Sequence, residues 1–424
     1  MGNLNTLFER WRTGFLGDVL KLSLGTLGGR LIGFLALPVL TRLYSPDDFA
    51  VLALYLALVS TLAVASCFRL EVAIPLAETD DEAAALLALA LFFLTVVAAV
   101  LAVISIFLRD PVIRALRAPT LAPYLWLVPM GVVMAGSYSA LQNWATRTRR
   151  FGDIARTRVT QAVAGVTAML TLGGLGVTPL GLLLGNMLNI GAGGIRLATS
   201  ALRLSAGPLR GVRLTSLASA LRRNRRYPLF STPESVFNIA GAQVPVMMIA
   251  AHAGPEAGFM MLAMQVMTAP MTLLGGAISQ VYVSRAPDEY RAGRLAPFTL
   301  SIMRRLVLVG SGPLILAGAL APWVFPLIFG PEWARSGEIV TQLVPWMALQ
   351  FIASPVSMVM FVVGRQRAML ALTTFGAVLR ISSVGVAIAA GYPVVLVFAV
   401  SSAVFYATCC VVFMSAARFD VKRA

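Results

Sequence analysis

Long apolar stretches alternate with short polar connections along the whole chain of 424 residues. Each stretch holds roughly 20 residues, the length that an α-helix needs to cross a bilayer. The stretches are apolar on all sides and lack period-two alternation, which predicts helices and argues against a barrel. We therefore predict an all-α, polytopic membrane protein with about 12 transmembrane helices. The predicted spans are residues 18–43, 49–74, 83–107, 120–143, 157–176, 178–198, 229–251, 257–283, 300–326, 338–363, 367–389 and 391–415.

The polar connections divide this pattern into two halves. A basic cytoplasmic loop at residues 199–228 separates an N-lobe of six spans (18–198) from a C-lobe of six spans with a basic tail (229–424). In residues 1–17, apolar side chains recur at helical spacing with arginines opposite, which is typical of an amphipathic helix lying in the membrane interface.

The two halves resemble each other faintly. Each has a proline-valine pair near a helix end, then a polar turn and a phenylalanine, so that Pro38 corresponds to Pro245 and Phe49 to Phe259. Because both halves start on the cytoplasmic side, they form a parallel pseudo-repeat. This predicts two six-helix bundles around a central cavity.

Composition confirms the class, and the charge distribution fixes the orientation. Hydrophobic residues make up 58% of the chain, charged residues 12%, and the mean hydropathy is +0.83, which excludes a soluble protein. With the N-terminus in the cytoplasm, 27 of the 34 lysines and arginines face the cytoplasm, five face the other side, and Arg30 and Arg380 lie within spans. The net charge of +16 is therefore explained by the positive-inside rule for membrane proteins. Both termini are predicted to be cytoplasmic, with membrane lipids as partners and no nucleic acid.

The three cysteines, Cys67, Cys409 and Cys410, all fall within predicted spans. We interpret them as packing residues, and we predict no disulfide framework, no metal site and no cofactor.

Four segments, in this order, resemble one known family. They begin "LPVLTRLYSPDDFAVLALY", "FRLEVAIPLAETDDEAAALLAL", "YPLFSTPESVFNIAGAQVPVMMIA" and "FGPEWARSGEIVTQLVPW". Together they are similar to Wzx-type polysaccharide-biosynthesis (oligosaccharide) flippases of the multidrug/oligosaccharidyl-lipid/polysaccharide exporter superfamily. The motif residues are Arg69 and Glu71, then Phe329, Gly330, Trp333, Gly337, Pro345, Trp346, Ser354 and Pro355.

The resemblance implies a flippase that works by alternating access with a cationic central cavity. Its substrate would be an oligosaccharide repeat linked to undecaprenyl pyrophosphate, carried from the cytoplasmic to the periplasmic leaflet. The product would serve O-antigen, capsule or exopolysaccharide assembly. The implied location is the bacterial inner membrane, with a polysaccharide polymerase and other assembly proteins as possible partners.

Two arginines within spans are the first candidates for substrate binding. A charge at bilayer depth costs about 2.5–3.5 kcal/mol on insertion scales, so Arg30 and Arg380 need a partner, a wet cavity or a ligand. Arg30 borders a ridge of small residues, Gly25, Gly29 and Gly33. We predict that Arg30 and Arg380 bind the pyrophosphate. The alternative is a structural arginine that caps carbonyls or pairs with an acid of its own lobe.

Four other ionisable residues have open roles. Arg69 and Glu71 are candidates for substrate binding or for an interface anchor. Because they stand two positions apart on a predicted helix, we expect them not to form a simple mutual pair. Glu234 and His252 are possible coupling residues. The alternatives are that Glu234 offsets the arginine-rich loop and that His252 is an interfacial residue.

Uncharged amides could bind sugar hydroxyls. We predict this role for Gln243 and Gln265, with Gln142, Asn143 and Gln280 as further cavity candidates, and interhelical hydrogen bonding as the alternative. The family often has a basic residue near the position of Gln265, so a glutamine there implies a less cationic cavity.

Two rival functions remain. A cation-coupled multidrug antiporter of the same superfamily needs a carboxylate in mid-membrane, and the arginine-bearing, acid-poor spans argue against it. A membrane enzyme needs paired acids or a metal site on a sizeable outer loop, and the longest such loops, residues 108–119 and 327–338, offer few acids. We therefore predict that the protein is not an enzyme.

Overall fold

The computed structural model describes residues 15–204 and 213–419, and these residues form helices without any strand. The first part contains α2 (Phe15–Leu43), α3 (Pro46–Ser66), α4 (Leu70–Ala73), η1 (Ile74–Leu76), α5 (Asp80–Phe107), α6 (Arg109–Leu116), η2 (Pro119–Tyr124), α7 (Leu127–Arg147), α8 (Phe151–Gly174), α9 (Leu180–Gly191) and α10 (Gly193–Leu204). The second part contains α12 (Leu214–Arg223), η3 (Tyr227–Ser231), α13 (Thr232–Ala253), α14 (Pro255–Arg291), α15 (Leu295–Leu306), η4 (Val307–Ser311), α16 (Gly312–Phe329), η5 (Pro331–Trp333), α17 (Ala334–Val356), α18 (Val359–Val362), α19 (Gln366–Ala390) and α20 (Val394–Phe419).

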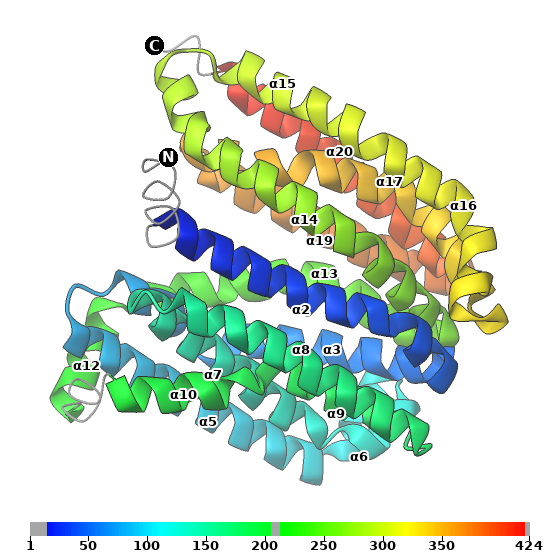
Figure 1. Ribbon diagram of the computed structural model, residues 1–424, viewed down its shortest axis with the longest axis horizontal. Coiled ribbons are helices and arrows are strands. Elements are labelled where there is room, and N and C mark those ends of the chain that lie inside the picture. The colour runs from blue at the N-terminus through cyan, green and yellow to red at the C-terminus, as the bar shows by residue number, and fades with distance from the viewer. Residues whose placement is uncertain (1–14, 205–212, 420–424) are drawn as a thin grey trace, which may run out of the picture. The chain divides into compact units, whose positions relative to one another are not determined.

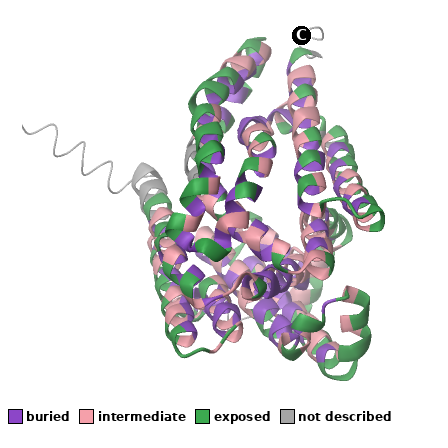
Figure 2. Cartoon of the chain, turned by 90° about the vertical axis from the view of Figure 1, so that its right-hand side faces the viewer, coloured by how far each residue is buried: buried purple, intermediate pink, exposed green. Residues whose placement is uncertain are grey.

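Membrane spanning is evident from the lengths and composition of these helices. Within the described residues, nine helical segments are long and apolar enough to cross a bilayer. Many large apolar side chains are also exposed, among them Leu308, Leu327 and Phe107. Exposed positions run along the helices and are not confined to their ends (Figure 2). The prediction of an all-α, multi-span membrane protein is confirmed.

The chain forms two compact units. The first comprises residues 1–44 and 54–239, and the second comprises residues 45–53 and 240–424. The lobe boundaries predicted at residues 199–228, like the central cavity, stay predictions. The predicted interfacial helix at residues 1–17 lies almost wholly outside the described residues.

In the first unit, α2 packs along α8 through two of its glycines (Figure 1). A methyl group on Gly25 would lie 2.6 Å from Cα of Ala155, and one on Gly29 would lie 2.8 Å from the carbonyl oxygen of Arg158. Only hydrogen fits at such distances, so the small-residue ridge allows the two backbones to approach. A methyl group on Gly33 would meet no atom of another helix within 4 Å, so this glycine lies outside the contact.

In the second unit, Trp333 is a central packing residue. It is fully buried, and its ring contacts Phe49 at 4.9 Å and Phe259 at 5.9 Å between centroids. A methyl group on Gly258 would lie 1.9 Å from the carbonyl oxygen of Pro46. These contacts explain why the start of α3 belongs to the second unit. The two phenylalanines that the internal repeat matches therefore pack on one tryptophan.

Several predicted spans are interrupted in the structure, and three examples show how. The span predicted at residues 49–74 ends as a helix at Ser66, and α4 follows after a break. The span at 178–198 consists of α9 and α10 (Figure 1), and the span at 300–326 contains a π-helical turn, η4. Apolar periodicity detects the length of a buried segment but is insensitive to a short change in helix type.

The cysteines are free thiols, with Cys67 and Cys409 buried. Among the described residues, no group of three His, Cys, Asp or Glu side chains is placed to hold a metal ion.

Candidate functional site

Arg30 lies near the middle of α2, beside the tight α2–α8 seam, and its side chain is exposed. Its chain neighbour Gly29 touches the backbone of Arg158 on α8. The Arg158 side chain is half-buried, and its Nη2 donates a hydrogen bond to Oε1 of Gln142 at 3.1 Å. Its buried Nε has no hydrogen-bond partner. A second arginine therefore comes from the helix that faces α2.

Sequence reasoning missed Arg158 as a site residue. It stands at the edge of an apolar stretch and was therefore counted among the cytoplasmic charges. The structure starts α8 at Phe151, which places Arg158 two turns inside the helix. The sequence does contain a pattern that indicates Arg158 as a candidate: Gln142 and Arg158 are both polar residues within or beside apolar stretches.

Arg69 and Glu71 lie at the break after α3. Phe68 and Arg69 have left-handed backbones, with φ of 51° and 58°, and Arg69 precedes the first residue of α4. This geometry brings Arg69 Nη1 to 3.7 Å from Oε1 of Glu71. Our expectation that the two cannot pair was wrong, because it assumed one continuous helix and Arg69 is not helical.

The break concentrates strain and unsatisfied polar atoms. Glu71 is 4% exposed, and neither its Oε2 nor the Nε of Arg69 has a hydrogen-bond partner. Burial raises the pKa of the Glu71 carboxyl above its ordinary value, and a backbone hydrogen bond and the Arg69 guanidinium offset this in part. Left-handed non-glycine residues and orphaned buried polar atoms are typical of functional sites.

Arg380 is held within the second unit. It is 8% exposed, its Nε donates to the carbonyl oxygen of Gly376 at 2.8 Å, and its guanidinium carbon lies 4.8 Å from the ring centroid of Phe405. A methyl group on Gly241 would lie 2.6 Å from Cβ of Ala377 and 3.6 Å from Nη2 of Arg380. The charge is thus stabilised by a carbonyl and an aromatic face of its own unit.

The other predicted residues are spread along α13 and α14. Gln243 is half-buried, whereas Gln265, Glu234 and His252 are exposed. Nδ1 of His252 lies 3.0 Å from the carbonyl oxygen of Met248, one turn earlier. Their predicted binding and coupling roles stay predictions.

Several motif residues of the family resemblance are packing residues. Gly330 has φ of 108°, which only glycine adopts without strain, and Phe329 is buried against Phe325. A methyl group on Gly337 would lie 2.5 Å from the carbonyl oxygen of Ala321. This motif therefore specifies the α16–α17 connection.

Several solved structures share this fold. The chain is similar to the lipid II flippase MurJ in an inward closed conformation, with a TM-score of 0.66, 11% identity, and coverage of 95% of this chain and 87% of that one. It is similar to a multidrug resistance MATE family transporter of the MOP superfamily, with a TM-score of 0.59, 13% identity, and coverage of 97% and 96%. It is also similar to a MOP superfamily transporter from Pyrococcus furiosus whose binding pocket has reversed polarity, with a TM-score of 0.57, 14% identity, and coverage of 96% and 95%. The protein is a multi-pass membrane protein with the MOP-superfamily transporter fold.

The family follows from the sequence. Residues 39–338 match the model of the polysaccharide biosynthesis protein family, and the chain belongs to that family. A search of curated proteins finds no match. The resemblance drawn from the sequence motifs is confirmed.

Proposed function

We propose that this protein flips a polyprenyl-pyrophosphate-linked oligosaccharide repeat from the cytoplasmic to the periplasmic leaflet by alternating access. Membership of the polysaccharide biosynthesis family and the MOP-type fold support a transporter of lipid-linked sugars. The flipped repeat would feed O-antigen, capsule or exopolysaccharide assembly. The location would be a bacterial inner membrane, with both termini cytoplasmic and a polysaccharide polymerase as a partner.

The observation that carries the proposal is that each of the two packed helices, α2 and α8, has an arginine at or next to their seam. Arg30 is exposed in the middle of an apolar helix, and the facing Arg158 has a buried Nε with no protein acceptor. A pyrophosphate presents several acceptor oxygens, which suit the planar forks of two guanidinium groups. We assign first contact with the pyrophosphate to Arg30, with Arg158 as a second donor.

The remaining predicted residues take secondary roles in this proposal. Arg380 already binds Gly376 and Phe405, so it adds positive potential and does not make first contact. Gln243 and Gln265 would bind sugar hydroxyls, and Arg69 with Glu71 would take part at the α3–α4 break. Glu234 and His252 are proposed only as coupling residues.

The direction of transport agrees with the electrostatics. Moving an anion from a negative interior to a positive exterior is favoured by about 2.3 kcal/mol per charge per 100 mV. The alternative, a cation-coupled multidrug antiporter, needs a buried mid-membrane acid. In the described part of the chain, Glu71 is the one buried carboxylate, and it lies beyond the end of α3.

The test is headgroup translocation in proteoliposomes. A fluorescent lipid-linked oligosaccharide is placed in both leaflets, and an impermeant quencher reports how much reaches the outer one. We expect Arg30→Ala to abolish translocation, Arg30→Lys to retain part of it, and Arg158→Gln to reduce it. Arg42→Ala is the matched control, because Arg42 is an exposed arginine in the last turn of the same helix.

Full translocation by the Arg30→Ala protein would refute the assignment of Arg30. Efflux of cationic dyes driven by a Na⁺ or pH step, without any flipping of the lipid, would favour the antiporter instead.

A further inference from the structure

A groove lies at one end of the second unit, where α13 and α19 end and α14, α17 and α20 begin. Its first part, of about 290 Å³, runs between α19 and α20. Its second part, of about 450 Å³, continues past the α19–α20 turn to the starts of α14 and α17. Ala387 and Tyr392 line both parts, so the two are adjacent. Volumes of roughly 300–1,000 Å³ are usual for small-molecule sites.

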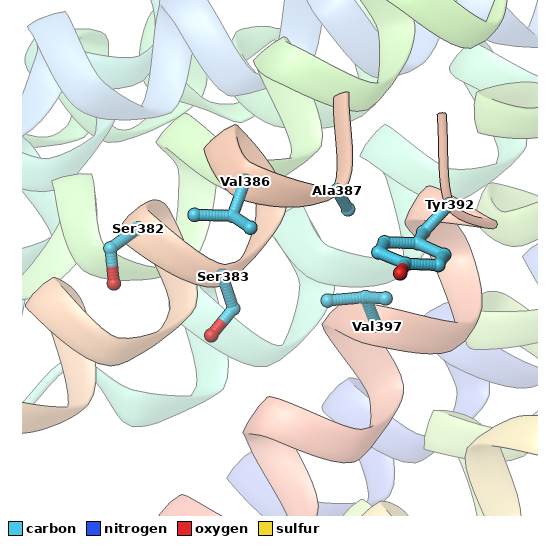
Figure 3. Close-up of a pocket in the computed structure, with 6 residues that line it drawn as sticks. All are labelled: Ser382, Ser383, Val386, Ala387, Tyr392 and Val397. Carbon is cyan, nitrogen blue, oxygen red and sulfur yellow. The ribbon is translucent and has the colours of Figure 1, made fainter. Parts of the chain in front are cut away.

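The first part of the groove is mixed in character. Ser382 and Ser383 of α19 contribute hydroxyls, and Val386 and Val397 contribute apolar surface. Figure 3 shows the Tyr392 ring beside Val397, with its hydroxyl directed along the groove and the serine hydroxyls further along α19. Tyr392 is 63% exposed, so one face of an aromatic ring is available to a ligand.

The second part of the groove is charged. Arg335 of α17 donates to both carboxylate oxygens of Glu256, from Nε at 2.9 Å and from Nη2 at 3.3 Å. Its Nη1 donates to Oε2 of Glu338 at 2.7 Å. His252 at the end of α13 also lines this part. Glu338, which is not part of the lining, completes an ionic cluster in which two acids share one arginine.

This chemistry selects a neutral, hydroxyl-rich ligand. A phosphate would meet the Glu256 carboxylate, and the one guanidinium in the lining, that of Arg335, is already engaged by Glu256 and Glu338, so an anion is disfavoured. A pyranose ring offers an apolar C–H face for Tyr392 and a rim of hydroxyls for serine, tyrosine, carboxylate and imidazole groups. We propose that the groove is a saccharide-binding site, distinct from the residues assigned to the pyrophosphate.

The position of the groove suggests its use. Under the positive-inside topology, α13 and α19 run outward, so the groove opens on the outer side. This inference rests on the proposed function: the sugar portion of the carried lipid would dock there as it leaves. The groove would then favour release of the substrate on the outer side.

Direct binding tests the site. Saturation-transfer NMR is recorded on the full-length protein in nanodiscs, with free cellobiose and chitobiose as probes. We expect Tyr392→Ala to lower the saccharide signal about tenfold, as truncation of a central aromatic contact does, and Tyr392→Phe to keep most of it. Tyr290→Ala, at the far end of α14, is the matched exposed tyrosine and should leave the signal unchanged.

A second variant shows whether a loss of saccharide binding is caused by misfolding. Val397→Trp fills the groove from α20 and should also remove the signal while leaving the melting temperature unchanged. No saccharide signal with the unmodified protein, an equal signal from Tyr392→Ala, or displacement by inorganic pyrophosphate would each overturn the proposal.

The flipping assay separates this proposal from the previous one. Arg30→Ala should abolish flipping and leave saccharide binding intact. Tyr392→Ala should flip the lipid several-fold more slowly. If the Tyr392→Ala variant bound no sugar but flipped the lipid at the normal rate, the groove proposal alone would be refuted. If the unmodified protein bound sugar but flipped no lipid, the flippase proposal alone would be refuted.

Discussion

Single residues decide the local structure where the predicted second span breaks. Two consecutive left-handed residues, Phe68 and Arg69, turn the chain, and the turn places the Arg69 guanidinium beside the buried Glu71. A buried carboxylate that loses its positive neighbour keeps its desolvation cost. The Arg69–Glu71 pair should therefore contribute more to the free energy of unfolding than an ion pair on the surface would.

Removing Arg69 alone should lower the free energy of unfolding more than removing the charges of both Arg69 and Glu71. We expect Arg69→Ala to lower the free energy of unfolding by about 1–3 kcal/mol, the usual cost of an unsatisfied buried group. Adding Glu71→Gln should restore part of this loss, because the amide has no charge to desolvate. Thermal unfolding in detergent of both single variants and the double variant gives the coupling energy. Strictly additive effects would contradict the pairing.

A glycine position in α14 permits an equally local test. Gly258→Ala would place a methyl group 1.9 Å from the Pro46 carbonyl oxygen, and we expect a loss of about 1–3 kcal/mol from overpacking. Gly276→Ala in the same helix, where no atom lies within 4 Å, should be neutral or slightly stabilising. Melting temperatures in detergent compare the two variants. Equal melting temperatures would show that the start of α3 does not pack on α14 this closely.

At the scale of elements, the sequence predicted the spans well and their interruptions poorly. Each predicted span corresponds to a helix or to neighbouring helical pieces, because burial in lipid requires long apolar runs whatever the local geometry. The breaks at Ser66, at Ala192 and in η4 depend on single backbone conformations and on tertiary contacts. Hydrophobic periodicity carries no information on single backbone conformations or on tertiary contacts.

The candidate site was predictable in type but not in arrangement. An arginine within an apolar span, such as Arg30, is visible in the sequence because of its energetic cost. The backbone contact that sets Arg158 against Gly29 depends on which helices pack together, and the groove beside Tyr392 joins residues from five helices. No local pattern encodes such long-range neighbours.

Helix α12 illustrates how a basic element is fixed to the first unit. Asn224 donates to Oε1 of Glu82 at 3.0 Å, and Arg223 lies 3.7 Å from Glu82 and 3.8 Å from Glu78. The Glu82 side chain is only 10% exposed, so its contacts are shielded from water in part, whereas the Arg223 and Glu78 side chains are 65% and 83% exposed. One carboxylate thus holds the end of α12 on the start of α5.

Loss of this carboxylate should release α12. We expect amide hydrogen exchange in residues 214–223 to be about tenfold faster or more in Glu82→Ala, since a hydrogen bond to a charged group is worth about 1.5–3 kcal/mol. Asp81→Ala, at an exposed neighbouring position, is the control and should exchange like the unmodified protein. Unchanged exchange in Glu82→Ala would mean that packing alone holds α12.

At the scale of the whole molecule, one property underlies every functional proposal, namely the orientation in the membrane. The bias of 27 against five positive charges predicts that α12 lies on the cytoplasmic side and the α19–α20 turn on the outer side. If the orientation were reversed, the saccharide groove would face the cytoplasm. It would then serve loading of the substrate and not its release.

Labelling with a membrane-impermeant maleimide tests this orientation directly. The background is a chain with Cys67, Cys409 and Cys410 replaced by serine or alanine, into which Ser219→Cys or Tyr392→Cys is introduced, both at exposed positions. We expect Tyr392→Cys to react in intact cells and Ser219→Cys to react only in inverted membrane vesicles. The opposite pattern would reverse the topology, and the substrate would then meet the groove on the cytoplasmic side, before transport and not after it. Because release on the outer side requires a groove that opens there, this labelling decides whether the groove can serve release in the proposed outward transport, whose electrostatic driving force is the same for either insertion.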